Sequence, residues 1–211
     1  MQIIKITTMA MAAAVVAGCA VNAPQCGPGS QEAGCAPATA APAGESREQQ
    51  EARLNAFEQK LNAEIQGAEQ GLASAVAAGK SQPAAQRARN PVVKTTSAPI
   101  QDSKSSRIYE FRVLDTASID MPLAGKGRPA YVQAMDEIKA LANQLADSRG
   151  SALIIVDQSS ADIRAKRVNT KVGVTQTVGG NPVTVEKVST GAVARGIERY
   201  TIKPGEVAAR P

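Results

Sequence analysis

Cys19 is the residue whose surroundings most clearly define a reaction. Lys5 supplies a positive charge near the start of the chain, and residues 9–17 form an apolar run of Met, Ala and Val. Two small residues, Ala17 and Gly18, come directly before the thiol. This order is typical of an export signal with a cleavage site. The apolar run of roughly 10 residues is too short to span a bilayer, which needs about 20. The sequence therefore predicts export and cleavage close to Cys19.

The four residues Val16-Ala17-Gly18-Cys19 resemble the lipobox of bacterial lipoproteins. The resemblance covers residues 1–19. It implies a signal peptide of residues 1–18, cleavage before Cys19, a lipid on the Cys19 thiol and acylation of the new amino terminus. Ala20, where enteric lipoproteins of the inner membrane carry Asp, implies sorting to the outer membrane. We therefore expect a lipid-anchored outer-membrane protein that faces the periplasm. The alternative is an ordinary secretory signal in which the cysteine occurs by chance.

Catalytic chemistry has few residues to draw on in this chain. Histidine is absent, which removes the commonest general base and the commonest zinc ligand. A Ser-His-Asp or Cys-His arrangement therefore cannot form within the chain. We expect no catalytic residues and no cofactor, and a hydrolase is the weakest alternative.

Two further thiols, Cys26 and Cys35, form a candidate disulfide. An exported chain meets an oxidising compartment, where such a pair is favoured. In the chain-entropy model, closing a loop of about ten residues stabilises a protein by roughly 2–3 kcal/mol. A metal site is the alternative, but two thiols without His or further Cys do not favour one, so we expect no metal.

Composition argues against nucleic-acid binding. Acidic and basic residues are interspersed, the formal net charge is only +5, and aromatic residues make up 2% of the chain, with no Trp. Proteins that bind single strands stack the bases on aromatic side chains. We therefore expect no nucleic-acid partner.

Residues 19–45 are rich in Ala, Pro, Gly and Ser, which predicts a flexible tether. Residues 46–78 consist mostly of good helix formers, with Gly67 and Gly71 each weakening the helix by roughly 1 kcal/mol relative to Ala. Apolar residues recur there at steps of three and four, and the stripe repeats every eleven residues: Leu54, Phe57, Leu61, Ile65, Ala68, Leu72 and Val76.

A narrow apolar stripe on a long helix must be covered by something. Its eleven-residue period favours a nearly straight seam over a left-handed coiled coil. The stripe can self-associate as a coiled coil in a homo-oligomer, dock on the protein's own domain, or bind a partner. The alternative is an isolated amphipathic helix of marginal stability. We take four of its residues as candidate partner contacts: Leu54, Leu61, Ile65 and Leu72.

Residues 79–106 contain several prolines and many Ser and Thr, which predicts a linker, and residues 107–204 form the folded domain. Alternation over 107–114 predicts a half-buried strand, followed by a loop to residue 128 with a short strand inside it. Helical spacing with Pro129 at the first position and Gly150 as the stop predicts a helix over 129–149.

The apolar run over 152–156 predicts a strand buried on both faces. Strands over 163–178 and 183–190 flank a hairpin turn at Gly179-Gly180-Asn181, a last strand continues over 192–202, and residues 205–211 form a loose tail. The predicted fold class is α+β. It comprises a small, mainly antiparallel sheet with one covering helix, preceded by a separate amphipathic helix and flexible linkers.

Asp157 and Arg164 lie just past the strand predicted over 152–156 and are candidates for glycan binding. The helix followed by Leu-Ile-Ile-Val-Asp resembles peptidoglycan-binding domains of the outer-membrane protein A type, which place an Asp after such a strand and an Arg on the next helix. Asp157 matches the Asp, and Arg164 or Arg167 the Arg. The chain departs from that pattern because residues 168–178 alternate like a strand where the family has a helix.

The order of elements also resembles small ring-forming domains in lipoproteins of secretion and conjugation machines, by layout alone. We expect a non-enzymatic, lipid-anchored envelope protein that acts through contacts with other envelope proteins. The alternative is a peptidoglycan-binding lipoprotein. Basic residues along the predicted hairpin have two possible roles: they prevent unwanted pairing at an edge strand, or they bind an acidic partner or an anionic headgroup. These residues are Lys166, Arg167, Lys171, Lys187, Arg195 and Arg199.

Overall fold

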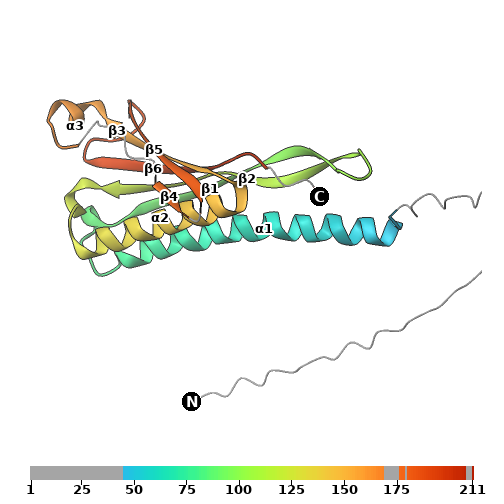
Figure 1. Ribbon diagram of the computed structural model, residues 1–211. Coiled ribbons are helices and arrows are strands. Elements are labelled where there is room, and N and C mark those ends of the chain that lie inside the picture. Colours follow the sequence, from blue (N-terminus) through green and yellow to red (C-terminus); the bar gives the residue numbers. More distant parts are fainter. Residues whose placement is uncertain (1–44, 169–175, 179, 208–210) are drawn as a thin grey trace, which may run out of the picture. The chain divides into compact units, whose positions relative to one another are not determined.

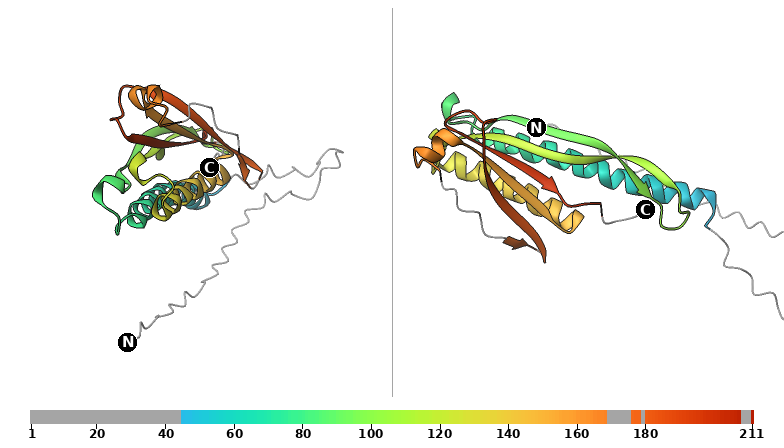
Figure 2. Two further views of the ribbon diagram at one scale, coloured as in Figure 1. Left: turned by 90° about the vertical axis from the view of Figure 1, so that its left-hand side faces the viewer. Right: turned by 90° about the horizontal axis from the view of Figure 1, so that it is seen from above.

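The computed structural model describes residues 45–168, 176–178, 180–207 and 211. Two long helices, α1 (Arg47–Ala78) and α2 (Pro129–Arg149), lie side by side on one face of a six-stranded sheet (Figure 1; Figure 2, left). The α+β class with a mainly antiparallel sheet is confirmed, although two helices cover the sheet where one was expected.

The strand order is β1-β2-β6-β3-β5-β4. All neighbouring strands pair antiparallel except β3 and β5, which run parallel. The strands are β1 (Arg89–Gln101), β2 (Ile108–Pro122), β3 (Ala152–Ser159), β4 (Gln176–Val178), β5 (Asn181–Thr190) and β6 (Ile197–Pro204). Three short helical turns join them: η1 (Ala84–Gln86), η2 (Leu123–Gly125) and α3 (Ser160–Arg164).

Helix α1 forms where the sequence predicted it, and a capping box starts it. The Ser46 side chain accepts a hydrogen bond from the Gln49 amide, and the Gln49 side chain accepts one from the Ser46 amide. The expectation of a separate helix is wrong, because α1 packs on α2, β1 and β2 within one compact unit. The apolar stripe is therefore covered by the protein's own domain, which was one of the three options.

Gly67 and Gly71 allow α1 and α2 to approach each other closely. A Cβ added at Gly71 would lie 3.4 Å from Leu141 Cβ, and one at Gly67 would lie 3.0 Å from Gln144 Nε2. The two residues weaken α1 as an isolated helix. In the folded protein the absence of side chains at these two positions makes room for α2. Larger residues there would push the two helices apart.

The predicted linker over 79–106 is wrong, because most of it is strand β1. The prolines that favoured a linker include Pro91 and Pro99, which lie within this strand. Proline lacks an N–H, so it is tolerated on an edge strand, and β1 has a neighbour, β2, on one side only. The apolar alternation that would identify a strand is also weak in this segment, because most residues of β1 are exposed.

Strand β2 runs unbroken where a strand, a loop and a second short strand were predicted. The pairing of β1 with β2 shifts register between Lys94 and Thr95. Such a bulge changes the face to which the side chains point. Before it, Phe111 and Val113 face one small core; after it, Ala117 and Ile119 join the main core. The apolar alternation therefore breaks within one continuous strand.

The small core lies at one end of the molecule, in a part that we call the arm: the first half of α1 with the β1–β2 hairpin from Ala98 to Val113. Seen from above, these segments extend together beyond the other strands (Figure 2, right). The buried apolar residues of the arm are Phe57, Leu61, Ile100, Phe111 and Val113. The main core lies between both helices and the rest of the sheet.

Helix α2 begins with Pro129 in its first turn and ends at Gly150, whose φ is +80°, as predicted. Strand β3 also forms, but burial alternates along it: Ile154 and Val156 are buried, whereas Leu153 and Ile155 are half-buried. The expectation of burial on both faces is wrong because both long helices lie on the same side of the sheet (Figure 2, left).

The β4–β5 hairpin turns at Gly180, one of the predicted turn residues, which has a φ of +91°. Gly179 lies outside the described residues. The predicted strand over 163–178 is wrong at its start, where α3 extends to Arg164, and right at its end, where β4 forms. Residues 169–175 of this prediction lie outside the described residues. The last strand, β6, does not continue β5 but lies between β2 and β3. The tail is also not loose throughout, because the Gly205 amide donates to the Ser151 carbonyl and Val207 packs against the small core.

No helix in the part of the chain that the structure describes is long and apolar enough to cross a membrane.

Candidate functional site

A groove lies between α2 and the sheet, beside the face that α1 covers. Helix α1 packs on β1 and β2, whereas the long helix that packs on β3, β5 and β6 is α2. Beyond α2 this leaves an open cavity of about 240 Å³. Its apolar lining comes from α2, β3, β5 and β6: Met135, Ile154, Val156, Val183, Val185 and Tyr200. Concave, mostly apolar sites with a few polar groups are the usual form of binding sites.

Three polar side chains also line this groove. Lys139 and Asn143 lie one turn apart on α2, and Lys187 lies on β5. Lys139 Nζ is 3.6 Å from Asp136 Oδ1, but both side chains are more than half exposed. Exposed ion pairs of this kind contribute only about 0.2–1 kcal/mol. The groove therefore combines apolar walls with two cationic groups.

A buried carboxylate, Glu198, lies behind Tyr200. It is 3% exposed and accepts hydrogen bonds from Gln158 Nε2 at 2.7 Å and from the hydroxyls of Tyr131 and Tyr200, both at 3.3 Å. Lys126 Nζ lies 3.7 Å away and supplies a positive charge. A buried polar network in which the carboxylate has several partners holds its members in one arrangement. Here it fixes the Tyr200 ring that forms part of the groove wall.

Both phenols of this network stay protonated at neutral pH. Burial raises the pKa of Tyr131 to about 12, and burial also raises the pKa of Tyr200, with the negative charge of Glu198 acting in the same direction on each. Protonated hydroxyls can donate to Glu198, so the network is a set of fixed donors around one acceptor. Within the described ranges, no three His, Cys, Asp or Glu side chains lie close enough to hold a metal ion.

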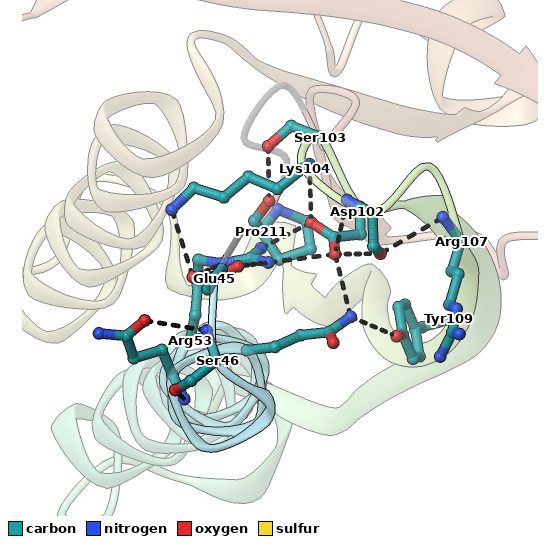
Figure 3. Close-up of polar contacts among 12 residues, drawn as sticks. Glu45, Ser46, Arg53, Asp102, Ser103, Lys104, Arg107, Tyr109 and Pro211 are labelled. Atoms are coloured by element: carbon teal, nitrogen blue, oxygen red, sulfur yellow. Dashed lines mark hydrogen bonds and ion pairs between the residues drawn. The ribbon is translucent and has the colours of Figure 1, made fainter. Parts of the chain in front are cut away.

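A second polar cluster lies at the tip of the arm (Figure 3). The Asp102 carboxylate is fully buried and accepts hydrogen bonds from Arg53 Nη1 at 2.7 Å and Nη2 at 3.1 Å. It also accepts from the Lys104 and Ser105 amides and from the Ser105 hydroxyl. Arg53 in turn contacts Glu45 at 2.8 Å. One carboxylate therefore closes the β1–β2 turn and joins it to the start of α1.

The tip cluster makes stability depend on pH. The hydrogen bonds from Arg53 hold the pKa of Asp102 well below its ordinary value, and those from Ser105 act in the same direction. A lowered carboxyl pKa contributes stability above the unfolded-state pKa of about 3.9, and this contribution is lost as the pH falls below that value. We expect Asp102→Asn to destabilise the protein at pH 7, and the difference from wild type to shrink between pH 5 and pH 3.

Urea denaturation at pH 7, 5 and 3 measures this difference. Asp147→Asn is the matched control, because Asp147 is exposed on α2. An Asp102→Asn difference that stays constant with pH would contradict the assignment.

The structure does not bring Asp157 and Arg164 together as a glycan site. Arg164 is exposed on α3, and no hydrogen bond or ion pair joins the two among the described residues. Asp157 pairs in register with Arg199 on β6, and Arg199 also pairs with Asp120 on β2, with Nε 2.7 Å from Asp120 Oδ1. The negative charge of Asp157 contributes to raising the pKa of Arg199. Asp157 is thus part of a row of alternating charges across three strands.

The candidate partner contacts on α1 are mostly used inside the domain. Leu61, Ile65 and Leu72 are at most 5% exposed, and Leu54 is half-buried against the arm core. No partner or second copy can reach the first three in this fold, so the proposed partner contacts and the coiled coil through them are corrected. Cys19, Cys26 and Cys35 lie outside the described residues, as does the predicted tether up to residue 44. Its last residue, Glu45, is held by ion pairs with Arg53 and Lys104.

The groove and the Glu198 network were not predicted from the sequence. One signal was present: Glu198, Tyr200 and Ile202 alternate on one face of β6, so a carboxylate shares the face that enters the core. A charged residue on an otherwise apolar face predicts a buried polar contact. Its partners Tyr131 and Gln158 come from separate elements, and nothing in the local pattern connects them.

No protein-family model, curated protein or solved structure matches this chain.

Proposed function

We propose that this protein is a non-enzymatic lipoprotein, anchored through Cys19 in the bacterial outer membrane, whose folded domain binds another envelope protein. The lipobox resemblance of Val16-Ala17-Gly18-Cys19 supports the anchor. The observation that carries the binding role is the groove beside α2. It is an open apolar cavity on a domain that exposes few large apolar side chains. Among the described residues, the exposed ones are Val92, Ile108 and Val132.

The lining of the groove favours recognition over reaction. Its walls are mainly aliphatic, and its one phenol, Tyr200, is engaged by the buried Glu198. Lys139, Lys187 and Asn143 can donate hydrogen bonds to a ligand at the same groove. Such a lining binds apolar groups and selects them by charge.

Replacing Cys19 by serine tests the anchor. We expect wild-type protein to incorporate labelled palmitate and to sediment with membranes, and Cys19→Ser to lose the label and move to the soluble fraction. A singly acylated protein binds membranes only marginally, whereas two or more chains anchor it stably. Cys26→Ser is the control and should keep both label and location. An unlabelled wild type, or a Cys19→Ser variant that still sediments, would refute the anchor.

Purified peptidoglycan distinguishes protein binding from the alternative glycan role. We expect the Cys19→Ser chain not to be retained by sedimented peptidoglycan. Retention that is lost in Asp157→Ala would favour the glycan-binding alternative and contradict the proposed partner class.

A further inference from the structure

We propose that the groove beside α2 binds one bulky apolar side chain of a partner protein, with an acidic residue next to that side chain. This inference rests on the proposed function, since it specifies the partner's chemistry at the same groove. Three observations support the inference: the volume of the groove, its charge, and the adaptability of its lining.

The volume of the groove selects the size of the group. A cavity of about 150 Å³ holds benzene, whereas sites for drug-sized ligands span about 300–1,000 Å³. At about 240 Å³ the groove lies between these ranges. It suits a single Phe, Leu or Met side chain and is too small for a complete acyl chain with its headgroup. Single anchors seated in pockets are also how protein interfaces concentrate their binding energy.

The charge of the groove selects the neighbour of that side chain. Lys139 approaches from α2 and Lys187 from β5, so two cationic groups lie on two sides of the same cavity. The carboxylate that accompanies Lys139, Asp136, is 66% exposed and 3.6 Å away. Exchanging this weak contact for a partner's carboxylate costs little. An Asp or Glu beside the apolar anchor therefore complements the groove, and a basic residue there would be repelled.

Two lining residues allow the groove to accept an anchor without refolding. Met135 is half-buried and unbranched, and methionine side chains adapt to the shape of what they contact. Tyr200 is held by the hydrogen bond from its hydroxyl to Glu198 at 3.3 Å. One wall is therefore adaptable and the other is fixed, which suits one side chain inserted between them.

Three small probes test the groove on the full chain carrying Cys19→Ser. 3-Phenylpropionate combines an apolar ring with a carboxylate, 3-phenylpropanamide lacks the charge, and decanoate represents a lipid chain. Methyl NMR spectra report binding through the signals of Met135, Val183 and Val185. We expect saturable shifts with 3-phenylpropionate and about three- to fivefold weaker binding of the amide, the size expected for exposed ion pairs.

Variants test whether the probes bind in the groove and whether the two lysines cause the preference for the acid. Lys139→Gln with Lys187→Gln should remove the difference between acid and amide. Val185→Phe should fill the groove and abolish the shifts, with a thermal melt to establish that it folds. Val188→Phe is its matched control, because Val188 lies on the same strand and its side chain points to the other face of the sheet. No saturable shift, or tighter binding of decanoate than of 3-phenylpropionate, would overturn the inference.

Photo-crosslinkers in cells separate this inference from the proposed function. One is placed at Lys139, beside the groove, and one at Ile108, which is 68% exposed on the arm. A crosslinked envelope protein from position 139 that disappears on addition of Val185→Phe supports the groove. Crosslinks from position 108 alone would leave the binding function standing and refute the groove as its site. Crosslinks from neither position would refute the binding function itself.

Discussion

Glu64→Ala is expected to lower the free energy of unfolding by about 3–5 kcal/mol, the usual effect of removing one partner of a buried ion pair. Glu64 on α1 is 7% exposed, and Arg149 at the end of α2 is 5% exposed. Arg149 Nε donates to Glu64 Oε2 at 2.7 Å, and Arg149 Nη2 lies 2.6 Å from the same oxygen. The Ser148 hydroxyl donates to the other carboxylate oxygen. Removing the carboxylate leaves a buried cation without its counter-charge.

Urea denaturation of the purified chain measures this loss. Glu69→Ala is the matched control, because Glu69 lies on the same helix and is exposed; we expect a change below about 0.5 kcal/mol. The double variant Glu64→Leu with Arg149→Met should recover most of the stability, since apolar replacement of both partners is often neutral or stabilising. A double variant that is less stable than Glu64→Ala would show that the pair itself stabilises the contact between α1 and α2.

Phe111→Ala is expected to cost about 3–5 kcal/mol, the usual range for removing a buried phenylalanine. Phe111 is 7% exposed on β2, and its ring meets the ring of Phe57 on α1 edge to face, with centroids 5.0 Å apart. Such ring pairs add about 0.5–1.5 kcal/mol to the burial of their surface. Because the core of the arm has only five buried residues, its packing has little capacity to close a cavity.

Ile108→Ala is the control for Phe111→Ala. Ile108 lies three residues away on the same strand but is 68% exposed, so we expect a change below about 0.5 kcal/mol. Amide hydrogen exchange locates the effect: protection should fall in the arm, from Ala98 to Val113, more than in β3. Equal loss of protection in both regions would show that the arm and the main core unfold as one unit.

Local sequence signals predicted the two long helices well. Helix-forming residues with apolar steps of three and four predicted α1, and Pro129 and Gly150 predicted the two ends of α2. Such signals are readable because their partners lie a few residues away in the chain. The hairpin at Gly180 belongs to the same class, since a left-handed φ is a local requirement.

The missing parts of the fold depend on partners that are distant in the sequence. Whether Pro99 breaks a strand or sits on its edge depends on how many neighbours β1 has, and no nearby residue records this. The glycines of α1 likewise lower local propensity, and their use becomes clear only against Leu141 and Gln144 on α2. The stripe on α1 predicted that it would be covered but could not select the surface that covers it.

The candidate site likewise depends on residues that are distant in the sequence. Asp157 was predicted just past a strand but lies within β3, which extends to Ser159. Its role is decided by Arg199 and Asp120 on two neighbouring strands. The groove is formed by side chains from four elements, and its existence depends on how far α1 extends across the sheet. Such a site arises from the placement of the helices and leaves no motif in the sequence.

The position of the arm gives the domain a built-in spacer. Helix α1 starts at Arg47, and Gly71, further along it, faces Leu141 in the middle of α2, the helix that lines the groove. At 1.5 Å per residue these two points on α1 are about 36 Å apart. Whatever precedes Glu45 is therefore attached at the far end of a rigid rod from the groove. Because a helix sets the distance between the start of α1 and the groove, this distance stays constant. It keeps the groove clear of the point where the preceding chain is attached.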